Sequence, residues 1–84
     1  MTNDTLMPLY GFVRGDMLGV VVLVRASDSV GTLIDTLQQA TAVRVKPGAR
    51  ARLFAGKREL DRASTVAAAG LTALERVDLV PEAG

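Results

Sequence analysis

The first third of the chain holds two apolar runs separated by a short polar turn. Residues 8–13 (PLYGFV) are rich in aromatic and β-branched side chains, and their proline comes first, where a missing N–H harms a strand least. Residues 17–24 (MLGVVVLV) form a second run that is strongly β-branched. Arg14-Gly15-Asp16 lies between the two runs. Because this connection is short, we expect the runs to pair as a β-hairpin.

The second predicted strand is apolar on both of its faces. Successive side chains of residues 20–24 point to opposite sides, and all five are Val or Leu. A sheet with a helix on one side usually alternates apolar with polar residues. The face that holds Val21 and Leu23 is therefore covered either by local loops or by a partner, since large apolar patches are uncommon on free monomers. Tyr10 and Phe12 of the paired strand belong to the same predicted patch.

An amphipathic helix is predicted after the hairpin. Its apolar residues recur at the spacing i, i+3, i+4, i+7, which places them on one stripe: Val30, Leu33, Ile34 and Leu37. Ser29 or Asp28 is placed to cap its first turn. The stripe must be buried against the sheet, and Lys46-Pro47-Gly48 then signals a turn.

Residues 49–80 supply the remaining elements. Ala51 and Leu53 alternate with Arg50 and Arg52, which predicts a strand with one buried and one wet face. A glycine turn at Gly56 and a short return strand marked by Leu60 are expected after it. Thr65 then caps one helical turn over residues 66–69, which Gly70 ends. Val77 to Val80 is the closing strand.

This order of elements predicts an α+β protein of the β-grasp class, a mixed sheet with one main helix packed across it and a short one-turn helix. The order, together with Phe54-Ala55-Gly56-Lys57 in the glycine turn, resembles ubiquitin. We expect a disordered terminus over residues 1–6, a single ubiquitin-like domain over 7–81 and a short tail over 82–84.

Composition removes most catalytic chemistry. The 84 residues include no cysteine and no histidine, so thiolate nucleophiles, zinc fingers and the commonest general base are excluded. The Asp and Glu residues fall in predicted turns or on exposed faces without a metal-binding or paired-carboxylate spacing, and each is expected to be a solvated acid or a cap. We therefore expect no catalytic, cofactor-binding or metal-binding residue.

Charge and hydropathy also limit the partners. A net charge of +1 with both signs interspersed gives no electrostatic footprint for nucleic acid or an anionic membrane. The N-terminus is acidic where a signal peptide would be basic, and the longest apolar run, residues 18–24, is far shorter than the roughly 20 residues that span a bilayer. The expected location is the cytoplasm.

A set of short motifs over almost the whole chain is similar to the small ubiquitin-like subunit, called gamma or system protein B, of bacterial toluene, benzene and alkene monooxygenases. These motifs are Pro8, Asp16-Met17-Leu18, Asp28-Ser29-Val30, Thr65-Val66-Ala67, Gly70-Leu71-Thr72 and Glu75-Arg76-Val77-Asp78. The resemblance implies a non-catalytic subunit of a hydroxylase component that is a dimer of three-subunit units, partnered by an alpha subunit that holds a di-iron centre and by a beta subunit.

The alternative is a ubiquitin-like protein of another system, such as a type VII secretion accessory or an atypical modifier or sulfur carrier. Modifiers and sulfur carriers act through a tail that ends Gly-Gly, whereas this chain ends Pro81-Glu82-Ala83-Gly84, which argues against conjugation.

Two sets of residues are predicted to contact the alpha subunit. The first is Tyr10, Phe12, Val21 and Leu23 on the outer side of the hairpin. The second is Leu53 and Val80, which fall where ubiquitin presents its binding patch.

Overall fold

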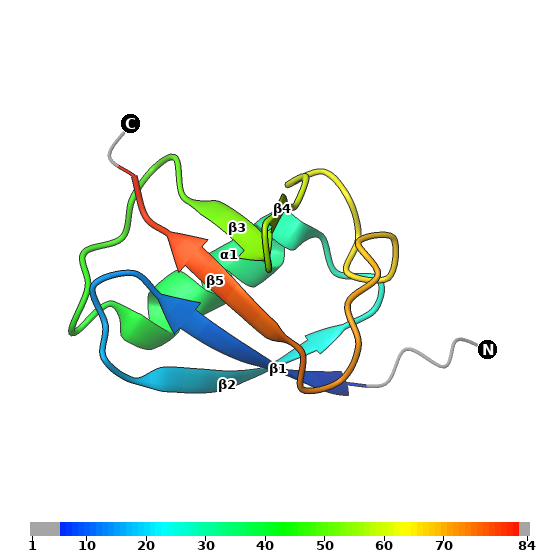
Figure 1. Ribbon diagram of the computed structural model, residues 1–84, viewed down its shortest axis with the longest axis horizontal. Coiled ribbons are helices and arrows are strands. Elements are labelled where there is room, and N and C mark those ends of the chain that lie inside the picture. The colour runs from blue at the N-terminus through cyan, green and yellow to red at the C-terminus, as the bar shows by residue number, and fades with distance from the viewer. Residues whose placement is uncertain (1–5, 83–84) are drawn as a thin grey trace.

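The computed structural model of the chain describes residues 6–82, and in that range a single helix crosses one face of a five-stranded sheet (Figure 1). The strands lie in the order β2-β1-β5-β3-β4. β1 and β5 are parallel, and the other neighbours are antiparallel, so the sheet is mixed and the predicted β-grasp fold is confirmed. The elements are β1 (Leu6–Val13), β2 (Gly19–Arg25), α1 (Val30–Thr41), β3 (Arg52–Ala55), β4 (Arg58–Glu59) and β5 (Arg76–Val80).

The predicted hairpin is confirmed as β1 and β2, with bounds that differ by one or two residues. Leu6, placed by the sequence in a disordered terminus, opens β1 opposite Arg25; the rest of that terminus, residues 1–5, lies outside the described residues. β2 begins at Gly19 because the Leu18 N–H donates to Asp16 Oδ1 at 3.2 Å and so belongs to the turn. Gly15, with φ +96°, supplies the left-handed residue that this turn requires.

Helix α1 begins directly after its N-cap and covers the predicted apolar stripe. Ser29 is the N-cap, since its Oγ accepts a hydrogen bond from the Thr32 N–H at 3.0 Å. Asp28, the other candidate, instead accepts from the Arg25 N–H at 2.8 Å and closes the connection from β2. The whole predicted stripe is buried against the sheet: Val30, Leu33, Ile34 and Leu37.

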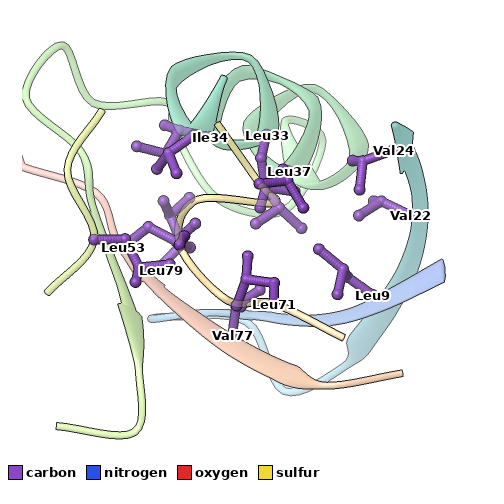
Figure 2. Close-up of a cluster of buried hydrophobic side chains, with 14 of the residues drawn as sticks. Leu9, Val22, Val24, Leu33, Ile34, Leu37, Leu53, Leu71, Val77 and Leu79 are labelled. Carbon is purple, nitrogen blue, oxygen red and sulfur yellow. The ribbon is translucent and has the colours of Figure 1, made fainter. Parts of the chain in front are cut away.

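The core lies between α1 and the inner face of the sheet, where side chains from both layers meet (Figure 2). Burial of one such leucine contributes about 1.5 to 3 kcal/mol relative to leaving it exposed. The sheet contributes inward residues from four strands, among them Leu9, Val22, Val24, Leu53, Val77 and Leu79.

Two short elements differ from the sequence prediction. The return strand β4 is Arg58–Glu59, two residues before the point marked by Leu60, which is buried just after it. Residues 66–70 form hydrogen-bonded turns rather than a helix. The Thr65 cap is nevertheless present, because Thr65 Oγ1 accepts from the Ala68 N–H at 3.0 Å, and Gly70 ends the turn with φ +77°.

The predicted tail begins later than expected. The Glu82 carbonyl accepts from the Arg50 N–H at 3.0 Å, and its carboxylate binds Arg52 at 3.1 Å. Glu82 is thus attached to the domain, while the rest of the predicted tail, residues 83–84, lies outside the described residues.

Candidate interaction surface

The sheet face opposite α1 carries an apolar patch over β1 and β2. Strand alternation turns Tyr10, Phe12, Val21 and Leu23 away from the core, and these four residues are called the apolar patch below. Val21 is 56%, Leu23 58% and Tyr10 42% exposed, and Phe12 is half-buried. Tyr10 lies directly opposite Val21 in the register of the hairpin. The structure therefore brings the whole first set of predicted residues together, and within residues 6–82 no loop fully covers them.

Gly19 makes room for the two aromatic rings of the apolar patch. The Tyr10 and Phe12 rings are stacked, with centroids 5.2 Å apart and planes inclined by 6°. Gly19 lies opposite Phe12, and a Cβ on it would come within 2.5 Å of the Tyr10 ring and 2.8 Å of the Phe12 ring. The two rings thus occupy the space that a side chain at position 19 would fill. This close packing against the backbone of β2 restricts the movement of Tyr10 and Phe12.

The other half of the same face is charged. The Arg76 guanidinium lies 4.1 Å from the Phe12 ring centroid and binds Asp78 at 3.0 Å, so it forms the boundary of the apolar patch. Farther along the sheet, Arg52 binds Glu59 and Glu82, each at 3.1 Å. The hydrogen bond with Glu59 is the main cause of the raised pKa of Arg52, and the same bond lowers the pKa of Glu59. Arg52 and Arg76 on this half of the face therefore already have acidic partners within the chain.

The second predicted set does not form a surface. Leu53 is 0% exposed and points into the core beneath α1, opposite Leu79 of β5 (Figure 2), so its side chain cannot contact a partner. Val80 pairs with Arg52 and is only half-buried. The assignment of Leu53 to an interface is therefore corrected: the alternation of β3 turns it inward.

The described residues offer no recognisable catalytic arrangement. No group of three or more Asp or Glu residues in residues 6–82 is placed to hold a metal ion. A hollow of about 400 Å³ lies beside the apolar patch, lined in part by Phe12, Arg14, Arg76 and Asp78. It contains no nucleophile next to a general base. Within the same residues, no helix is long and apolar enough to cross a membrane.

One acid departs from the predicted solvated state. The Asp16 side chain is only 2% exposed, and both of its carboxylate oxygens accept from Arg44 Nε, at 2.9 and 3.1 Å. Burial acts to raise the pKa of Asp16, but the hydrogen bonds from the Leu18 N–H and from Arg44, together with the Arg44 charge, outweigh it and the pKa is lowered. The ion pair ties the β1–β2 turn to the segment after α1, a contact between residues 28 apart.

This ion pair predicts an acid-sensitive contribution to stability. Because the pKa of Asp16 is lower in the folded state than its ordinary value of 3.8, its contribution is present above that value and is lost as pH falls through the folded pKa. We expect Asp16→Asn to lower the free energy of unfolding at pH 7 and to flatten its decline on acidification, as measured by urea denaturation at pH 7 and pH 3. Glu59→Gln, which breaks an exposed pair, is the matched control and should change the pH 7 value less. Equal losses for the two variants would contradict the role given to Asp16.

The chain was compared with family models, curated proteins and solved structures, and only solved structures are similar to it. No family model matches the sequence, and no curated protein matches it. Among solved structures, a chain of a toluene 4-monooxygenase HD complex with the inhibitor 4-bromobenzoate aligns with 93% of this chain and 100% of its own length, with a TM-score of 0.83 and 25% identity. That chain is therefore also small.

Other similar structures are ubiquitin-like proteins. Ubiquitin of Caldiarchaeum subterraneum covers 95% of this chain and 98% of its own, at 17% identity and a TM-score of 0.75. A ubiquitin-like domain of an Arabidopsis thaliana protein covers 94% and 80%, at 18% identity and a TM-score of 0.72. The chain thus has the ubiquitin-like β-grasp fold, and its structure confirms the resemblance to the ubiquitin-like gamma subunit of bacterial toluene, benzene and alkene monooxygenases.

Proposed function

We propose that the chain is the non-catalytic gamma subunit of the hydroxylase component of a multicomponent bacterial di-iron monooxygenase that oxidises toluene, related aromatics or alkenes. The observation that carries this proposal is the likeness to the small chain of the toluene 4-monooxygenase complex, which extends over the full length of that chain. The other ubiquitin-like structures share the fold at lower TM-scores and lower identity. Fold alone would not select a function, and the higher TM-score and identity of the match to this complex support the one proposed.

In this proposal the chain docks on the catalytic alpha subunit and stabilises it. The apolar patch supports docking, because aromatic residues are enriched and charged residues depleted at the centre of protein interfaces. Arg76, whose guanidinium lies over the Phe12 ring and whose side chain is 63% exposed, then provides a polar rim. The beta subunit completes a three-subunit unit, and two such units form the hydroxylase.

The chemistry belongs to the alpha subunit in this proposal. Di-iron carboxylate centres of this kind are held by glutamates and histidines that project from helices. The present chain has no histidine, and α1, the one helix of residues 6–82, has a buried face that is entirely aliphatic apart from Thr41. The di-iron centre is accordingly assigned to the alpha subunit, and this chain is assigned no cofactor.

A native pull-down of the tagged chain from its own host, followed by mass spectrometry, tests the proposal. We expect a stoichiometric large subunit that contains iron. The same tag on an unrelated protein of similar size is the control. Recovery of an adenylating enzyme, or of adducts through Gly84, would replace the proposal with a modifier, and recovery of a membrane ATPase would replace it with a secretion accessory.

A further inference from the structure

The outer edge of β2 is open over three residues. In an antiparallel pair, successive residues direct their backbone groups alternately to the two sides of the strand. The Tyr10 N–H donates to the Glu75 carbonyl and the Pro8 carbonyl accepts from the Leu74 N–H, so the even-numbered residues of β1 direct their backbone groups away from β2. Their partners in register therefore direct N–H and C=O to the free edge of the sheet; these partners are Gly19, Val21 and Leu23.

Both ends of this open edge are closed by the chain itself. At one end the Leu18 N–H donates to Asp16 Oδ1. At the other, the Arg25 N–H donates to Asp28 Oδ2 at 2.8 Å and the Arg25 carbonyl accepts from the Asp28 N–H at 3.0 Å. The unpaired stretch is thus about five residues long, or roughly 16 Å at 3.3 Å per residue.

This edge lacks the features that usually protect an edge strand. Free edges carry charges, proline or bulges that block pairing with another strand. Residues 19–24 contain none of these, and their register with β1 runs without a bulge. The opposite edge of the sheet, β4, is only two residues long and both are charged, Arg58 and Glu59. Only one edge of this sheet is built to accept another strand.

We infer that an extended segment of the large hydroxylase subunit adds to the β2 edge as a sixth strand, with apolar side chains at alternate positions beside Val21 and Leu23. The inference rests on the proposed function and specifies how the docking occurs. Arg25 is exposed at one end of the edge, and its side chain forms no ion pair within residues 6–82. The added strand is therefore expected to carry an acidic residue at the end that lies beside Arg25.

A second copy of the chain fits this edge less well. Pairing of β2 with β2 would leave the side chains of both apolar patches exposed on the outer face. The contact would also involve only three open residues of each copy, whereas a stable interface buries about 800 Å² on each partner. A strand that belongs to the subunit covering the patch satisfies the edge and the face together.

Amide hydrogen exchange tests the inference on the complex recovered with the large subunit. In the free chain the outward amides of Val21 and Leu23 should exchange fast, while those of Val20 and Val22, bonded to β1, are protected. In the complex, exchange at Val21 and Leu23 should slow by at least about 100-fold. A complex in which these two amides stay fast overturns the edge inference and leaves the proposed function standing. If no large subunit is recovered, both fail, and concentration-dependent protection in the free chain would assign the edge to a second copy.

A pair of variants separates the backbone from the side chain. Val21→Pro removes an N–H that β1 does not use and keeps an apolar side chain, while Val21→Ala keeps the N–H and shortens the side chain. We expect the proline variant to bind the large subunit at least about tenfold more weakly than the alanine variant, since it loses a hydrogen bond and leaves an acceptor unpaired. Equal binding by two folded variants would contradict the added strand.

Discussion

Lysine at both Val21 and Leu23 is expected to weaken binding to the large subunit by at least about 100-fold and to leave the isolated fold intact. Both side chains are more than half exposed in the free chain, so lysine there remains solvated and disturbs no core contact. In the complex the same positions would lie beneath a partner, where each unpaired ammonium is costly. A loss of about 3 kcal/mol for the pair corresponds to roughly 100-fold in the dissociation constant.

The double variant Ala40→Lys with Val43→Lys is the matched control. It adds the same two charges at exposed positions, Ala40 on α1 and Val43, 90% exposed, just after it. Titration of each purified variant against the large subunit, with thermal melting of each isolated chain, provides both readouts. Unchanged affinity of the Val21→Lys, Leu23→Lys variant would exclude the apolar patch as the docking face.

Most of the fold follows from patterns that are local in sequence. The stripe on α1 has the period of a helix, and the valine run of β2 together with a short turn leaves little choice but a hairpin. Those same patterns placed Val21 and Leu23 on the outer face, because alternation fixes the facing of every residue once the register is set. The first set of surface residues was accessible to prediction for this reason.

The error at Leu53 has an equally local cause. Leu53 follows Arg50 and Arg52, and two arginines on the wet face of a strand require the alternate residues, Ala51 and Leu53, to face the core. The comparison with the binding patch of ubiquitin pointed the other way. The structure agrees with the alternation, so the period of the chain's own sequence was the better guide at this position.

Contacts between segments that are distant in sequence could not be predicted from local patterns. Asp16 and Arg44 are 28 residues apart, and only the packing of the β1–β2 turn against the segment after α1 brings them together. The open edge of β2 likewise depends on which strands become neighbours, since β1 pairs with β5 rather than β3. Strand order is a property of the assembled sheet, and periodicity within one strand does not encode it.

Replacing Leu53 with alanine should have the largest effect on stability. The side chain is fully buried between the sheet and α1, and removing three carbons there leaves a cavity that costs about 2 to 5 kcal/mol. A domain of this size has a total stability of roughly 4 to 13 kcal/mol, so the melting temperature should fall by more than about 10 °C. Urea denaturation and thermal melting of the isolated chain measure this loss directly.

Val80→Ala provides the comparison, because Val80 was predicted to share a surface with Leu53 and lies on the neighbouring strand. Its side chain is only half-buried and faces the other side of the sheet, so we expect a loss of about 1 kcal/mol or less. If Leu53 were part of a docking face, its alanine variant would be stable and would bind the large subunit poorly. The core position predicts the reverse order: the Leu53→Ala chain loses stability first, and whatever fraction remains folded binds with the affinity of the unaltered protein.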